Sequence, residues 1–160
     1  MTARTADELD QVLEDTLPFL RSLTEETVSQ RPAPDRWTIK EVLGHLVDSA
    51  ANNHQRFIRA QFTAELVFPK YEQNEWVRSQ HYNDIDWSAL VGLWGAYNRH
   101  LAHVIRHVDP RALGVRCVIG PYAPVTLEFL IEDYVIHLNH HLTKIRERMA
   151  GVPESPESGR

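Results

Sequence analysis

Hydrophobic residues recur along the chain with the period of an amphipathic α-helix. Four segments show this period, at residues 6–23, 38–61, 86–108 and 126–150. Capping-box patterns mark the start of the first two helices, at Thr5-x-x-Glu8 and Thr38-x-x-Glu41. Pro18 predicts a kink or a break in the first helix, because proline cannot donate the helical hydrogen bond. The pattern therefore predicts four long helices.

The segments between these helices lack the helical period. Residues 62–86 hold many aromatic side chains, and we expect a long crossover with one short helix near Glu75. After Leu113, the run GVRCVIGPYAPV contains many turn residues and is expected to be an extended loop. The fold class is therefore all-α, a four-helix bundle with a long crossover between helices two and three. We expect one bundle domain over residues 1–150 and a disordered tail over 151–160.

Composition and charge narrow the classes of function. The chain has 160 residues, 42% hydrophobic and 24% charged, which is typical of a globular protein. A net charge of -5 with scattered basic residues argues against a nucleic-acid partner. The single cysteine, Cys117, excludes an intrachain disulfide, and nothing near it in the sequence lowers its thiol pKa to make it a nucleophile. Without a signal-peptide pattern or a long apolar run, we expect a cytoplasmic protein that does not contact membranes.

Histidine is enriched, with nine residues in the chain. His137 and His141 are four residues apart on the inward face of the last helix, a spacing at which two imidazoles can chelate one divalent ion. His45, at the edge of the apolar stripe of the second helix, is the best third ligand. Asp48, one turn further on, is a candidate to accept a hydrogen bond from an imidazole. The alternative is that these histidines are hydrogen-bonded core residues.

A rival group lies on the third helix. His103 and His107 also have chelating spacing, and His100 precedes them. Their helix face lies beside the apolar stripe and is expected to be solvated, which disfavours this group as the metal site. The other histidines have no partner at the level of sequence and are interpreted as surface or loop residues: His54, His81 and His140.

Two segments of the chain resemble a known family. WTIKEVLGHLVD, residues 37–48, followed by DYVIHLNHH, residues 133–141, resembles the DinB-like metalloprotein superfamily. The resemblance implies a four-helix bundle, often a homodimer, with one divalent metal ion per chain, most often zinc or nickel. Matched residue by residue, the three ligands are His45, His137 and His141.

The resemblance also implies an activity. WTIKEVLGHLVDSAANNHQRF followed by FPKYEQNEWVRSQHY is similar to the thiol S-transferase branch, whose members join a low-molecular-weight thiol to a small-molecule electrophile. The nucleophile would then be a metal-bound thiolate or water, and no side chain. The alternatives are a metal-dependent hydrolase of a carbonyl or epoxide that uses the same three histidines, and a non-catalytic metal-binding stress-response bundle.

Four further residues are candidates for the pocket around this site. Tyr134, one turn before the histidine pair, could hydrogen-bond a substrate, with a core position as the alternative. Trp76 and Tyr82 in the crossover could line the pocket mouth or simply pack there. Arg78 is a candidate to attract an acidic substrate.

Overall fold

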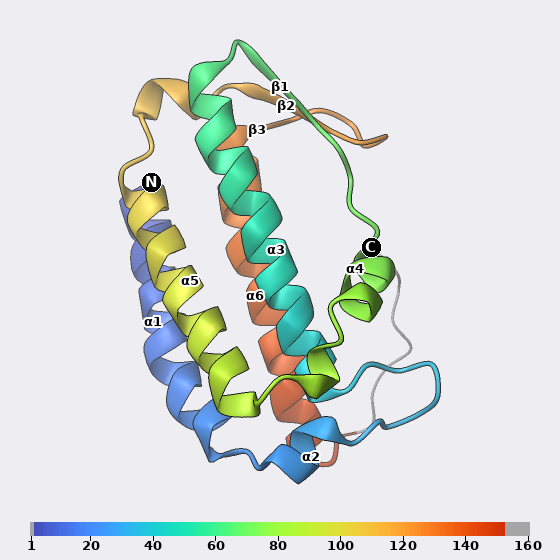
Figure 1. The fold of residues 1–160 in the computed structure, drawn as a ribbon. Coiled ribbons are helices and arrows are strands. Elements are labelled where there is room, and N and C mark those ends of the chain that lie inside the picture. Colours follow the sequence, from blue (N-terminus) through green and yellow to red (C-terminus); the bar gives the residue numbers. More distant parts are fainter. Residues whose placement is uncertain (1, 153–160) are drawn as a thin grey trace.

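A computed structural model of the protein describes residues 2–152. Four long helices run side by side, as Figure 1 shows: α1 (Thr2–Ser22), α3 (Ile39–Arg59), α5 (Trp87–Arg106) and α6 (Leu127–Met149). Apolar side chains from all four helices form one buried core. The predicted four-helix bundle, with its long crossover between the second and third long helices, is confirmed. The disordered tail was expected over residues 151–160. Of these, residues 153–160 lie outside the described residues.

Shorter elements connect the long helices. They are α2 (Glu25–Ser29), η1 (Ala60–Phe62), β1 (Glu65–Phe68), α4 (Gln73–Ser79), η2 (Tyr82–Asp84), η3 (Pro110–Ala112), β2 (Arg116–Ile119) and β3 (Val125–Thr126). The short helix expected near Glu75 is α4. The strands form one small sheet at one end of the bundle, and α2 lies at the other end (Figure 1). None of the helices in the described part of the chain is long and apolar enough to cross a membrane.

The sheet corrects the prediction of an extended loop after Leu113. β2 pairs in parallel with β1, with Leu66 opposite Cys117, and β3 pairs antiparallel to β2. Cys117 and Ile119 are buried and alternate with more exposed neighbours, which is the two-residue period of a strand. The partner strand comes from the crossover, about 50 residues earlier, so local periodicity could not reveal the pairing.

The first helix also differs from its prediction. α1 begins at Thr2, so Thr5 is a buried residue inside the helix rather than its cap. Pro18 does not break the helix. It lies on the exposed face, where water can bond the carbonyl that its missing N–H leaves free. Packing of the buried α1 side chains against the bundle therefore outweighs the local start and stop signals.

The start of α3 and the crossover are fixed to each other. The predicted capping box is present: the Thr38 hydroxyl accepts from the Glu41 N–H at 3.1 Å, and the Glu41 carboxylate accepts from the Thr38 N–H at 2.9 Å. Tyr82 of the crossover lies flat against Gly44, where a Cβ atom would come within 2.2 Å of its ring. A glycine at this position lets the crossover approach α3 beside His45.

Candidate metal centre

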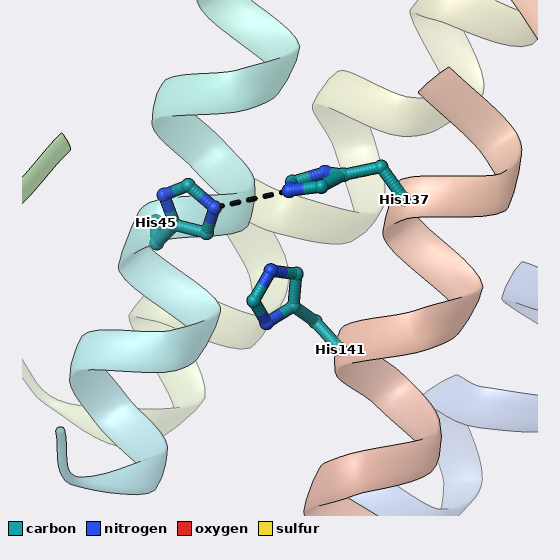
Figure 2. A group of neighbouring side chains, drawn as sticks. All are labelled: His45, His137 and His141. Carbon is teal, nitrogen blue, oxygen red and sulfur yellow. Dashed lines mark hydrogen bonds between the residues drawn. The ribbon is translucent and has the colours of Figure 1, made fainter. Parts of the chain in front are cut away.

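Three histidines from two neighbouring helices converge in the bundle. His45 lies on α3, and His137 and His141 lie one turn apart on α6. Figure 2 shows the three rings pointing toward one another across the space between the helices. One ring nitrogen from each lies within 4.8 Å of the others. Within residues 2–152, this is the single group of three or more potential ligands of histidine, cysteine or carboxylate type at such a spacing.

The distances fit a divalent metal ion. The Nε2 atoms of His45 and His137 are 3.3 Å apart. Two imidazole nitrogens at about 2.05 Å from a tetrahedral zinc ion would be roughly 3.3 Å apart. The ring centroids lie 4.6–5.2 Å apart, and the ring planes cross at 67–76°. Such edge-on rings direct several nitrogens into one volume, which the packing of core histidines alone does not require.

Burial keeps these imidazoles neutral. His45 is 1% exposed, and desolvation, followed by the effect of His137, lowers its pKa to about 3. Desolvation likewise lowers the pKa of His141 to about 3 and lowers that of His137. At neutral pH the nitrogen lone pairs are therefore available to a metal ion. The Nδ1 atom of His45 is buried and has no hydrogen-bond partner among residues 2–152.

Asp48 does not have the role that its position in the sequence suggested. Its Oδ1 atom accepts hydrogen bonds from the Tyr82 hydroxyl and from Gln80 Nε2, each at 2.6 Å, and Oδ2 has no hydrogen-bond partner within the described residues. None of these bonds involves an imidazole. Asp48 instead holds the crossover against α3, one turn from His45. Burial raises the pKa of this carboxyl group.

Two of the expected pocket residues are part of the packed interior. Tyr134 is 2% exposed, and its hydroxyl donates to Asn98 Oδ1, so it is a core tyrosine and does not reach a substrate. Tyr82 is also 2% exposed and is occupied by its contacts with Asp48 and Gly44. Each hydroxyl donates a hydrogen bond to a buried polar side chain. Helix spacing in the sequence does not indicate these hydrogen bonds.

The other two pocket candidates lie on α4, at the surface. Arg78 is exposed and forms an ion pair with Glu75 on the same helix, so its charge is already matched by a carboxylate. Trp76 is 39% exposed and lines a pocket of about 540 Å³ between α3 and the crossover. Cys117 is buried and its pKa is raised by desolvation, as expected for a thiol that is not a nucleophile.

The rival histidines form an exposed row. The rings of His100, His103 and His107 follow one another along α5, and His54 of α3 meets His100 with ring centroids 5.1 Å apart. His54 Nδ1 also hydrogen-bonds the Tyr97 hydroxyl at 3.2 Å, so His54 is not without a partner. All three α5 histidines are exposed, as predicted.

Sequence reasoning missed the pocket and a buried arginine beside it. The pocket is lined by Ala51, Asn52, Gln55, Phe68, Pro69, Lys70, Tyr71, Glu72, Glu75 and Trp76. Arg56 follows Gln55 on α3 and is 9% exposed. A signal was present in the sequence: His45, Ser49, Asn52 and Arg56 recur at helical spacing, so α3 carries a polar stripe through a buried helix.

Fold and cluster together define a helical bundle with a candidate three-histidine metal site. The sequence model of the DinB superfamily matches residues 8–145, most of the chain. The chain therefore belongs to the DinB superfamily, and the resemblance inferred from the sequence is confirmed.

One relative matches in both sequence and structure. The chain is 27% identical over 150 residues to YfiT of Bacillus subtilis (strain 168), a match that covers 88% of this chain and 82% of that protein. The solved structure of YfiT, described as a probable metal-dependent hydrolase with an unusual four-helix bundle topology, matches with a TM-score of 0.72 at 23% identity. That match covers 91% of this chain and 87% of the YfiT chain. It supports the fold.

Proposed function

We propose that this protein is a metal-dependent hydrolase of small molecules, with its divalent ion held by His45, His137 and His141. The observation that carries the proposal is the convergence of three imidazoles, two of whose Nε2 atoms are 3.3 Å apart. The description of YfiT as a probable metal-dependent hydrolase supports the same reaction class.

The histidines prepare the site for an ion with an open coordination position. Three neutral nitrogens leave room for water or substrate, as catalytic zinc sites do. His45 is buried, whereas His137 and His141 are partly exposed, so solvent reaches the cluster at the two α6 histidines. When bound, the ion supplies Lewis acidity and lowers the pKa of water. The chain supplies the orientation of the ligands and a largely desolvated wall.

The finer expectations have unequal support. The thiol S-transferase expected first from the sequence gains no support from the compared proteins, and the hydrolase fits them better. Imidazole ligands suit zinc and nickel equally well, so the identity of the ion stays a prediction. The homodimer and the low-molecular-weight thiol also stay predictions.

A hydrolysis assay tests the proposal. The untagged protein, loaded with zinc or with nickel, is given aryl esters and epoxides, and product is followed with and without a chelator. We expect turnover that needs the ion and is lost in His137→Ala/His141→Ala. Exposed imidazoles hydrolyse activated esters by themselves, so His103→Ala/His107→Ala is the matched control and should keep the metal-dependent turnover. Equal turnover by metal-free and metal-loaded protein would contradict the proposal.

A further inference from the structure

Arg56 is a buried cation without a carboxylate partner in the part of the chain that the structure describes. Its side chain is on α3, is 9% exposed, and has an Nε atom that meets no hydrogen-bond partner among these residues. Its Nη1 atom donates to the Asn53 Oδ1 atom at 3.3 Å, and its guanidinium carbon lies 5.6 Å from the centroid of the Phe68 ring. The side chains of Tyr71 and Cys117 also interact with it electrostatically. Among residues 2–152, no carboxylate lies within ion-pair distance of it.

A second buried cation in the same helix shows what a structural role requires. Lys40 is 1% exposed, and its ammonium group pairs with the Glu25 carboxylate and donates to the carbonyls of Asn83 and Ile85 at 3.1 and 2.6 Å. Its charge is fully matched. Burying a charge without such partners is costly. Desolvation accordingly lowers the pKa of Arg56.

The pocket of about 540 Å³ adjoins Arg56. Phe68, whose ring contacts the guanidinium, lines this pocket, and so do Asn52 and Gln55 from the same stretch of α3. Tyr71 and Trp76 contribute aromatic rings with centroids 5.2 Å apart. The volume suits a small molecule, and the lining combines apolar and aromatic side chains with polar ones that can orient a ligand. Of the charged lining residues, Lys70 pairs with Glu72 at 3.2 Å, and Glu75 pairs with Arg78, which lies outside the lining.

We propose that this pocket binds a small molecule with an aromatic or apolar body and a carboxylate, whose oxygens pair with the guanidinium of Arg56. A guanidinium binds carboxylates through two parallel hydrogen bonds, and its free Nε atom is one of the donors that such pairing uses. The aromatic rings pack against the body of the ligand. Binding of the carboxylate does not depend on the metal.

If the ligand is the substrate of the proposed hydrolase, this proposal names its chemical class, and it rests on the proposed function to that extent. Arg56 lies 11 residues after His45 on α3, which places the two Cα atoms roughly 16 Å apart along the helix. A substrate held by Arg56 would therefore be elongated, with its reacting bond toward the histidines. We therefore assign to Arg56 the role that the sequence suggested for Arg78, the attraction of an acidic substrate.

Calorimetric titration of the full-length protein tests the binding. The probes are phenylacetate, its neutral analogue phenylacetamide, and inorganic phosphate, each with metal-free and zinc-loaded protein. We expect metal-free protein to bind phenylacetate at least about tenfold more tightly than phenylacetamide, since a charge-assisted pair is lost with the amide. Arg56→Gln should remove this preference. Arg4→Gln, which removes an exposed arginine that pairs with Glu8 on α1, away from the pocket lining, should keep it.

Three results would overturn the proposal: equal affinity for phenylacetate and phenylacetamide, unchanged preference in Arg56→Gln, or tighter binding of phosphate than of phenylacetate. Loss of hydrolysis with the preference intact would instead contradict the proposed function alone. Preference seen only with zinc would assign the carboxylate to the ion and count against Arg56.

Thermal unfolding of the ligand-free variants separates a binding role from a structural one. A residue kept for ligand binding often costs stability, so Arg56→Gln should unfold at the same temperature as the parent or higher. Lys40→Met, which removes a fully paired cation, should unfold at a lower temperature. If Arg56→Gln unfolds as early as Lys40→Met or fails to fold, Arg56 is structural and the proposal is wrong. Arg56→Lys keeps the charge and should keep part of the preference for phenylacetate.

Discussion

Two groups of histidines in this protein have the same spacing in sequence and opposite surroundings. His137 and His141 on α6 are four residues apart, and so are His103 of α5 and His107, the C-cap of α5. The α6 pair faces His45 across the bundle, with ring planes at 71° to each other. The α5 pair lies at the surface, its planes are at 38°, and His107 Nδ1 is already bonded to the His103 carbonyl at 2.8 Å.

The difference shows that chelating spacing alone does not make a metal site. A metal site also needs a third ligand from another helix and a desolvated setting, because these fix the rings and keep the imidazoles neutral. The buried cluster consists of His45, His137 and His141, and the exposed row consists of His100, His103 and His107. We expect substitutions in these two groups to have different effects.

The largest effect should follow from removing ligands. In His137→Ala/His141→Ala, two of three nitrogens are gone, and zinc affinity should fall by at least about 100-fold. His103→Ala/His107→Ala removes the same number of imidazoles from the exposed row and should keep one ion per chain. Competition with a chromophoric chelator measures both. Equal loss in the two variants would place the ion elsewhere.

Acidification should destabilise the metal-free protein through the buried cluster. Burial lowers the pKa of His45 and His141 to about 3, whereas an unfolded histidine has a pKa near 6.5. Between these values the unfolded state binds more protons, so stability present above about pH 6.5 is lost as pH falls toward 3. The slope is at most about 1.4 kcal/mol per pH unit for each histidine.

Urea unfolding at several pH values measures this slope. The His141→Gln variant lacks one of the three titrating histidines of the buried cluster, so its stability should fall less steeply than that of the parent. Parallel curves for parent and variant would show that His141 takes up its proton as readily in the folded state as in the unfolded one.

A methyl group beside the buried cluster should cost more than one near the exposed row. In Gly44→Ala the new Cβ meets the Tyr82 ring within 2.2 Å, so the crossover must shift, at a cost of about 1–3 kcal/mol. Gly92→Ala on α5 meets nothing within 4 Å and should stabilise the helix by about 0.5–1 kcal/mol. Denaturant unfolding compares them, and a harmless Gly44→Ala would refute the packing of the crossover against α3.

The smallest effect is expected in the exposed row itself. His100→Ala should change the free energy of unfolding by no more than about 0.5 kcal/mol, because the ring is exposed and on a helix surface. The control is His54→Ala, which also removes the bond to the Tyr97 hydroxyl and should cost more. A larger loss in His100→Ala would show that the row contributes to folding.

The sequence revealed the helices and the His137/His141 pair because both depend on local spacing. His45 lies 92 residues before His137 and was added from its place at the edge of an apolar stripe and from the family resemblance. The start of α3 followed from the capping box at Thr38, and the predicted start of the last helix at residue 126 falls on Thr126, the N-cap of α6. The partners of Asp48 and Tyr134 could not be read from spacing, since they come from the crossover and from α5. The sheet was not predicted either, because β1 and β2 lie far apart in the chain.

Anomalous diffraction at the zinc edge, from crystals of the untagged protein grown with one equivalent of zinc, tests the central claim most directly. The account predicts a peak at about 2.0–2.1 Å from one nitrogen each of His45, His137 and His141, with a coordination position left for water or substrate. A peak confined to the exposed row, or no peak at the buried cluster, would contradict it.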